Sequence, residues 1–202
     1  MSSVARTRLT AEERRARLLA AAREQFARHG YHGAATAAIA RAAGCSEAIL
    51  YRHFHSKRDL LLAVLGAEVG ARVASGRAIA PPAGAPPTAG LADVLRARLD
   101  DEDMVVTARL ILLALAMTDD PEVGETMRAW FATVRAPLTA ALAGSQEAGL
   151  IRDDIDAETL TWLWHGLFLV AAVRNAIAQD GVASEAVDAA TVLAGLLRPP
   201  PA

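Results

Sequence analysis

Side chains that can bind a polyanion are concentrated in the first 60 residues of this 202-residue chain. These residues hold eleven of the 21 Lys and Arg side chains, among them Lys57, the only lysine, and four of the five histidines. The formal charge of residues 1–60 is +6, and that of the remaining 142 residues is −8. This asymmetry indicates a small head that binds a polyanion such as nucleic acid, followed by a larger acidic body.

Two short predicted helices position the polar side chains of this head. The first covers residues 36–43 and the second residues 46–54, and Gly44 lies in the turn between them, since glycine tolerates the left-handed backbone of a tight turn. This is the helix-turn-helix pattern, in which the second helix enters the major groove of DNA and its N-terminal residues contact base edges. The side chains expected to face outward are Ser46, Glu47, Ala48, Tyr51 and Arg52.

Longer helices on either side complete the head. Thr10 and Glu13 have the spacing of a capping box and predict a helix over residues 10–29. Ser56 starts a second long helix, at residues 56–79, which connects the head to the body. The residues available for a shared core in the head are Ile39, Ala40, Cys45, Leu50 and Phe54.

The rest of the chain predicts an all-α body. Hydrophobic residues make up 53% of the sequence and aromatic residues only 4%, and Ala and Leu recur at helical spacing. Residues 80–90 form a connector rich in Pro and Gly. We expect an all-α fold of about nine helices, with a head at residues 1–55 and a body at residues 56–202. The helices predicted in the body cover residues 91–99, 104–117, 121–142, 157–179 and 185–197, the last two capped by Asp156 and Ser184.

Several other classes of protein are not favoured. The single cysteine, Cys45, cannot form an internal disulfide, and the most apolar window, residues 162–173, is shorter than the roughly 20 residues that span a bilayer. The N-terminus has no apolar signal segment, and its Arg6 and Arg8 form either an arm for the minor groove or a solvated tail. We therefore expect a cytoplasmic protein without a membrane segment. The four acids at residues 100–103 have no histidine nearby, and we expect no metal, no cofactor and no catalytic residues.

The head resembles a known family over residues 10–65. Its spacing is similar to the N-terminal signature of the tetracycline-repressor (TetR) family of bacterial transcriptional regulators. The residues that carry the resemblance are Phe26, Ala27, Arg28, His29, Gly30, Tyr31, Thr36, Ile39, Ala40, Ala43, Gly44, Cys45, Ser46, Tyr51, Phe54, Ser56, Lys57 and Leu60. Glu47 departs from the family, where a basic or small residue is more usual, and Cys45 stands where a small aliphatic residue is usual, which indicates a core position.

The resemblance implies roles for individual residues. Lys57 resembles the family's phosphate-binding lysine, and Thr36 resembles the threonine whose hydroxyl and backbone N–H bind a phosphate. Tyr51 and His53 resemble positions that contact phosphates or nearby bases. Glu47 would either accept a hydrogen bond from a cytosine amino group or stabilise the start of its helix. The implied DNA contacts are Thr36, Ser46, Glu47, Ala48, Tyr51, Arg52, His53 and Lys57.

Aromatic residues in the body indicate either a pocket for an apolar ligand or ordinary packing. The candidate ligand-binding residues are Arg109, Trp130, Phe131, Trp162, His165 and Phe168. The alternatives are a surface position for Arg109 and a core histidine with satisfied hydrogen bonds for His165. Within the helix at residues 157–179, residues 160–173 are apolar almost all round, which indicates burial on more than one side.

The resemblance implies a homodimer, because the last two helices suit the dimer interface of the family. The apolar stripe on the last helix is Val187, Ala190, Thr191, Ala194 and Leu197. A dimer with two recognition helices reads a palindromic site in double-stranded DNA. The predicted function is therefore a ligand-responsive transcriptional regulator, a repressor released from its operator by a small, largely apolar effector. The alternative is a ligand-independent activator or adaptor whose body binds a protein partner.

Overall fold

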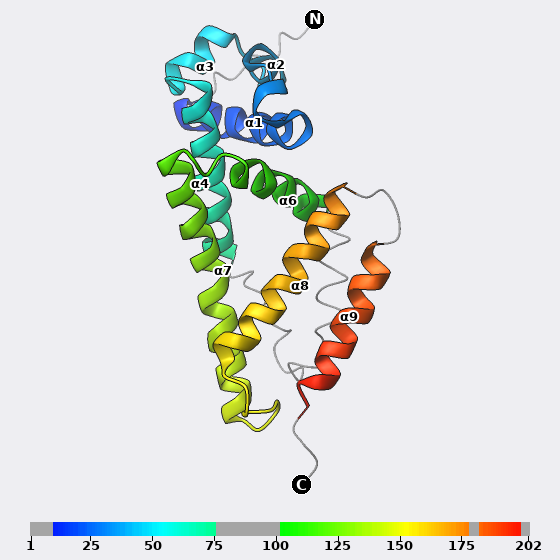
Figure 1. Cartoon of the computed structure of the whole chain (residues 1–202). Helices are drawn as coiled ribbons and strands as arrows, with labels where there is room; N and C mark the ends of the chain where they lie inside the picture. Colours follow the sequence, from blue (N-terminus) through cyan, green and yellow to red (C-terminus); the bar gives the residue numbers. More distant parts are fainter. Residues whose placement is uncertain (1–9, 76–101, 178–181, 199–202) are drawn as a thin grey trace, which may run out of the picture. The chain divides into compact units, whose positions relative to one another are not determined.

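The computed structural model describes residues 10–75, 102–177 and 182–198, and these contain eight α-helices and no strand. The all-α prediction is confirmed (Figure 1). The ninth predicted helix, at residues 91–99, and the Pro-rich connector lie outside the described residues. The chain divides into two compact units, Met1–Gly66 and Ala67–Ala202. The division falls inside the connecting helix, whereas our predicted head ends at residue 55.

The first unit contains the three helices of the head. They are α1 (Ala11–Gly33), α2 (Thr36–Ala42) and α3 (Glu47–His53), followed by the start of α4 (Lys57–Ser75). The capping box is confirmed, because Thr10 Oγ1 accepts from the Glu13 N–H at 3.1 Å and the Thr10 N–H donates to Glu13 at 2.7 Å. Gly30, at φ 68°, interrupts the helical backbone of α1, close to the predicted end at residue 29.

The core of the head follows the predicted pattern with one exception. Leu18, Ala22 and Phe26 of α1 are buried, because their spacing puts them on one face of the helix. Of the five residues predicted to share the core, Ile39, Ala40, Leu50 and Phe54 are buried. Cys45 is only half-buried, because it lies in the exposed turn between α2 and α3, so its interpretation as core is wrong.

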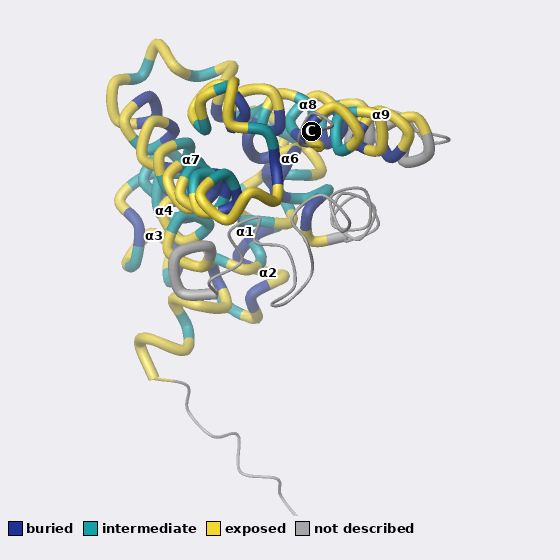
Figure 2. Tube along the Cα trace, turned by 90° about the horizontal axis from the view of Figure 1, so that it is seen from below, coloured by how far each residue is buried: buried dark blue, intermediate teal, exposed yellow. Residues whose placement is uncertain are grey.

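The second unit contains the rest of α4, α6 (Glu102–Leu115), α7 (Pro121–Glu147), α8 (Ala157–Ile177) and α9 (Val182–Leu196). α8 is its central helix and packs against α6, α7 and α9 (Figure 1). Buried positions recur between exposed ones along α7, α8 and α9 (Figure 2), as expected for helices that share a core on one side.

The ends of the body helices agree only partly with the predicted ends. α7 begins as predicted, with the Asp120 carboxylate accepting from the Glu122 N–H at 3.0 Å, but it extends to Glu147 because buried Leu142 and Ser145 continue its packed face. α8 begins after Asp156, whose carboxylate accepts from the Thr159 N–H at 2.8 Å, as predicted. α9 begins at Val182, so Ser184 lies inside its first turn and does not precede the helix.

Candidate functional site

The predicted recognition helix, α3, presents its polar side chains to the outside. Ser46, Glu47, Ala48 and Arg52 are exposed, and Tyr51 is 45% exposed. On the opposite face, Leu50 is buried against the head's core. The outward orientation predicted from the sequence is therefore confirmed.

The turn between α2 and α3 fixes where this face begins. Gly44 has φ 71°, a left-handed backbone that favours glycine, and its N–H donates to the Arg41 carbonyl at 3.0 Å. The Cys45 N–H donates to the Ala40 carbonyl at 2.9 Å. Ser46 then occupies the N-cap position of α3 with an extended backbone, but its side chain makes no capping hydrogen bond. Its hydroxyl is left on the outer surface.

Glu47 joins the two helices of the motif. Its carboxylate accepts a short hydrogen bond from the Thr36 hydroxyl at the start of α2. The Tyr51 hydroxyl, one turn after Glu47, donates to Thr36 Oγ1 at 3.4 Å. Three of the predicted DNA contacts therefore form one exposed network, in which the acid that departs from the family pattern orients the threonine hydroxyl.

Lys57 is held against the end of α1. Its Nζ donates to the His32 carbonyl at 3.2 Å and lies 5.1 Å from the centre of the Tyr31 ring. The Tyr31 ring stacks on buried Phe26 at 6.2 Å. The sequence prediction gives Tyr31 and His32 no contact with Lys57, because that contact joins residues 25 positions apart. These contacts orient the ammonium group.

The remaining predicted contacts differ in accessibility. Arg52 is exposed, whereas His53 is half-buried and its Nε2 is buried without a hydrogen-bond partner in the described part of the chain. Arg6 and Arg8 lie outside the described residues. The accessible charged groups of this face are therefore Arg52, Lys57 and Glu47.

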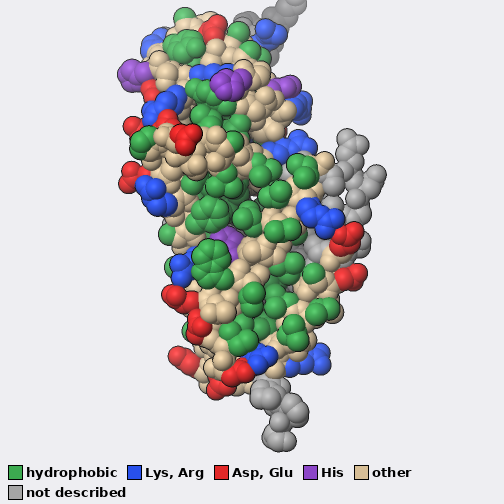
Figure 3. All heavy atoms as spheres, viewed as in Figure 1, with side chains coloured by type: hydrophobic (Ala, Val, Ile, Leu, Met, Phe, Trp, Pro, Cys, Tyr) green, Lys and Arg blue, Asp and Glu red, His purple; other side chains and the backbone are tan. Residues whose placement is uncertain are grey.

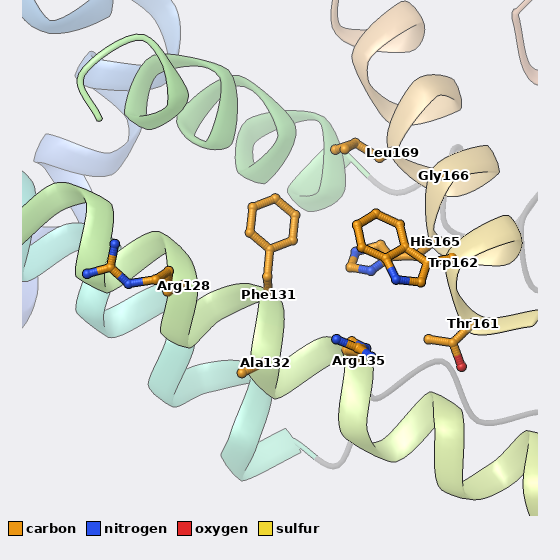
Figure 4. A pocket seen from close by; sticks show the side chains of 9 residues that line it. All are labelled: Arg128, Phe131, Ala132, Arg135, Thr161, Trp162, His165, Gly166 and Leu169. Carbon is orange, nitrogen blue, oxygen red and sulfur yellow. The ribbon is translucent and has the colours of Figure 1, made fainter. Parts of the chain in front are cut away.

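A groove of about 480 Å³ lies between α7 and α8 in the second unit (Figure 4). This volume is in the range of small-molecule sites, about 300–1,000 Å³. Phe131 of α7 and Trp162 of α8 lie on opposite sides of it (Figure 4). The residues lining the groove are Arg128, Phe131, Ala132, Arg135, Thr161, Trp162, His165, Gly166 and Leu169.

Three of the six predicted ligand-binding residues line this groove, namely Phe131, Trp162 and His165. Trp130 and Phe168 are 5% and 9% exposed and belong to the core. The Trp130 ring packs edge-on against Phe131, with 5.0 Å between centroids. Arg109 is exposed on α6 and does not line the groove.

The sequence prediction misses the two arginines of the groove. Arg128 and Arg135 are seven residues apart on α7, a spacing that returns to the same helix face after two turns. Arg135 Nη2 lies 3.1 Å from the carboxylate of Glu158 at the start of α8. The spacing with Phe131 and Ala132 between them could have indicated a charged edge to the predicted pocket.

His165 is not the satisfied core histidine considered as an alternative. Its Nε2 is buried and has no hydrogen-bond partner within the described residues. Its ring lies 5.7 Å from Phe131 and 6.3 Å from Trp130. Partial burial lowers the pKa of His165 below its usual value of 6.5, because burial disfavours the charged imidazolium. The ring is therefore neutral at pH 7, and it lines the groove while its Nε2 stays buried and unsatisfied.

The predicted dimerisation stripe on α9 divides between the inside and the outside of this chain. Val187, Ala190 and Leu197 are buried within their own unit, Ala194 is half-buried and Thr191 is exposed. The apolar side chains that α8 and α9 expose are different ones, and many hydrophobic side chains gather over these helices (Figure 3). Besides Trp162, which lines the groove, they are Leu163, Val170 and Ile177 of α8 and Val192 and Leu196 of α9, all more than half exposed.

The described residues contain neither a metal-ligand cluster nor a helix that could span a membrane. No group of three or more His, Cys, Asp or Glu side chains among them could hold a metal ion. None of the helices described is long and apolar enough to cross a membrane.

The head matches a family of known proteins. The model of the bacterial regulatory proteins of the tetR family matches residues 18–64. The HTH-type transcriptional activator FasR of Mycolicibacterium smegmatis is 53% identical over 58 residues, which are 29% of this chain and 26% of that protein. The chain thus matches about a quarter of the length of this relative. The similarity to FasR therefore does not extend over the whole protein.

Two other similarities extend into the body. The HTH-type transcriptional repressor AcnR of Corynebacterium efficiens is 29% identical over 147 residues, which are 72% of this chain and 73% of that protein. The structure of Salmonella enterica GusR superposes with a TM-score of 0.72 at 26% identity, over 94% of this chain and 97% of that one. The whole chain therefore shares its fold with such regulators.

Proposed function

The chain belongs to the TetR family of bacterial regulatory proteins, and from this premise we propose that it is a ligand-responsive transcriptional repressor that binds a palindromic operator as a homodimer. The observation that carries the proposal is the outward face of α3, where Glu47, Tyr51 and Arg52 are exposed while Leu50 anchors the helix in the head. A helix held in this way can enter the major groove of DNA without unfolding. A chromosomal operator implies a cytoplasmic protein.

The contacts in the head support separate roles for its polar groups. Arg52 and Lys57 supply positive charge for phosphates, which positions the head on DNA. Ser46, Glu47 and Ala48 supply the first turn of α3, which reads base edges. Thr36 and Tyr51 bring hydroxyl groups to the same surface and are linked to each other through a 3.4 Å hydrogen bond.

The exposed apolar side chains of α8 and α9 support the homodimer. Monomeric proteins rarely leave a continuous apolar surface of this kind in water, and a second copy with the same surface would cover it by two-fold symmetry. The residues that we assign to this surface are Leu163, Val170, Ile177, Val192 and Leu196, each 51–73% exposed. Val187, Ala190 and Leu197 would support it from beneath.

The groove between α7 and α8 supports a small-molecule effector. An effector that binds one conformation of the body more tightly than another shifts the balance between them. α4 begins in the first unit and ends in the second, so it is the element through which the body would reorient the heads. The effect of the effector on operator affinity equals the effect of the operator on effector affinity.

The proposal is tested by fluorescence anisotropy of the protein on labelled DNA from upstream of its own gene, with scrambled duplex as competitor. We expect specific binding that weakens in Tyr51→Ala and Lys57→Ala. Arg198→Gln is the matched control, because it removes one charge from an exposed residue of the body. If the protein binds neither this DNA nor sequences selected from a genomic pool, the proposal is wrong.

A second candidate function is a ligand-independent activator or adaptor. The exposed apolar side chains of α8 and α9 also suit a protein partner, and FasR, which is 53% identical over the 58 residues it shares with this chain, is named an activator. A reporter driven by the upstream promoter separates the two functions. Deletion of the gene raises expression if the protein is a repressor and lowers it if the protein is an activator.

A further inference from the structure

The charges of the groove between α7 and α8 select the kind of effector. Its lining contains two cations, Arg128 and Arg135, and no acidic residue. His165 is neutral at pH 7, because burial lowers its pKa, so it does not offset them. The charged side chains of the lining itself are therefore both positive, and positive charge in a partly enclosed site favours an anion, although Glu158 outside the lining pairs with Arg135.

The apolar part of the groove is formed mainly by two aromatic rings. Phe131 extends from α7 and Trp162 from α8, and Leu169 lies further along α8 (Figure 4). Trp162 is 69% exposed although it is the largest side chain of the site. An apolar body placed between Phe131 and Trp162 would remove this ring from water.

Arg135 is the better placed of the two cations. In Figure 4 the Arg128 side chain points away from Phe131 and Trp162, whereas Arg135 lies below the space between them. Arg135 pairs with Glu158 at 3.1 Å, and the two side chains are 43% and 69% exposed. Exposed ion pairs of this kind contribute little stability. A ligand carboxylate can therefore replace Glu158 at Arg135 with little loss.

From this arrangement we propose that the groove binds an amphipathic organic carboxylate, with its apolar body between Phe131 and Trp162 and its carboxylate on Arg135 in place of Glu158. The proposal names the class of effector and rests on the proposed function of the body as an effector domain. Aromatic rings alone would also suit a quaternary ammonium, but both arginines would repel it.

Three probes with the same ten-carbon chain and different head groups test the charge preference. Isothermal titration of the full chain, without DNA, would measure binding of decanoate, 1-decanol and decyltrimethylammonium below their micelle concentrations. We expect decanoate to bind at least about tenfold more tightly than decanol, as a charge-assisted hydrogen bond implies, and the ammonium to bind weakest. Equal binding of all three would overturn the proposal.

Two variants of the ion pair should act in opposite directions. Arg135→Gln should weaken decanoate binding by about tenfold or more, because the charged donor is lost. Glu158→Gln should strengthen it by about two- to fivefold, because Arg135 no longer has a competing carboxylate. Neither should change the binding of decanol. Glu185→Gln is the matched control, since it breaks the Arg174–Glu185 ion pair, 2.7 Å long, outside the groove.

Tryptophan fluorescence locates the bound probe. Of the three tryptophans, Trp130 and Trp164 are 5% and 3% exposed, so acrylamide quenching reports mainly on Trp162. Decanoate should protect Trp162 from acrylamide at a fixed protein concentration. If protection follows protein concentration and decanoate has no effect, a second copy covers the groove and the proposal is wrong. Operator binding would be unchanged in that case, which separates this failure from failure of the proposed function.

Discussion

The salt dependence of DNA binding distinguishes the charged contacts of the head from its hydroxyl contacts. Lys57 and Tyr51 are both predicted to contact the DNA backbone, but only Lys57 carries a charge. Lys57→Gln should therefore change the slope of log affinity against log salt concentration, because each neutralised phosphate releases condensed counterions. Tyr51→Phe should lower the affinity by the same factor at every salt concentration and leave the slope unchanged.

The expected size of the effect follows from the cations on the recognition face. Arg52, which is exposed, and Lys57, which is half-buried, are the two predicted DNA contacts that carry a positive charge, so a dimer would place four such cations on the DNA. Each phosphate contact contributes about −0.9 to the slope of log affinity against log salt, so four contacts contribute about −3.6. The DNA affinity of the wild type should then fall about 150-fold between 50 and 200 mM salt. Without Lys57 the two remaining contacts contribute about −1.8 to this slope, and the DNA affinity should fall only about 12-fold over the same range of salt.

The local contacts of Lys57 define the control for this experiment. Its Nζ donates to the His32 carbonyl and lies over the Tyr31 ring, and an exposed cation–π contact contributes only about 0.5–1 kcal/mol. Lys57→Gln keeps a donor for the carbonyl, so we expect the head to stay folded. The midpoint of thermal unfolding, measured for each variant, should confirm that the fold is intact.

The assay is anisotropy of a labelled operator at five or more salt concentrations between 50 and 200 mM. Parallel lines for the wild type and Lys57→Gln would refute the assignment of Lys57 as a phosphate contact. A changed slope for Tyr51→Phe would refute the distinction between charged and uncharged contacts. Arg52→Gln provides the internal standard, since it should reduce the slope by the same amount as Lys57→Gln.

Three further predictions follow from individual contacts. Glu47→Gln should reduce the preference for one base pair of the operator by about 1–3 kcal/mol, and anisotropy on operators with single base-pair changes would find that position; an unchanged preference at every position would exclude base reading by Glu47. Leu196→Glu places a charge on a side chain that is 61% exposed, and sedimentation should then detect monomers in place of dimers. Asp156→Ala should lower the midpoint of thermal unfolding, since it removes the N-cap of α8. Hydrogen bonds from the Thr159 hydroxyl and N–H lower the pKa of Asp156 below its usual 3.8, so the cap should contribute fully at neutral pH and lose its effect as the pH falls through that lowered pKa. Thermal melts of the wild type and Asp156→Ala at several pH values would measure this difference. A difference in unfolding midpoint that grows as the pH falls would contradict the prediction.

The sequence predicts the head well because the contacts that build it are local. The capping box of α1 joins residues three apart, and Gly44 controls a turn formed by its immediate neighbours. Such features depend on backbone conformation and capping, which are properties of short segments. The link between Thr36 and Glu47 is less predictable, because it depends on the angle at which α3 leaves the turn.

The body is less predictable, because its helices expose or bury apolar residues according to their neighbours. α9 carries apolar residues on more than one face, and its sequence alone cannot say that Val187 is buried while Val192 is 64% exposed. α8 is similar, with buried Trp164 beside exposed Trp162. Periodicity identifies helices of this kind but does not assign their faces when most positions are apolar.

The two sites depend on different kinds of sequence information. The recognition face uses residues within one stretch of the head, where turn and capping positions constrain the spacing. The groove combines Arg135 with Trp162 and Glu158, which come from two helices and are brought together only by their packing. Substitutions at these positions would alter the charge or shape of the groove and leave the caps and turn of the head unchanged. A protein built in this way could change its effector while keeping its operator, because the residues that we propose to select the two ligands do not overlap.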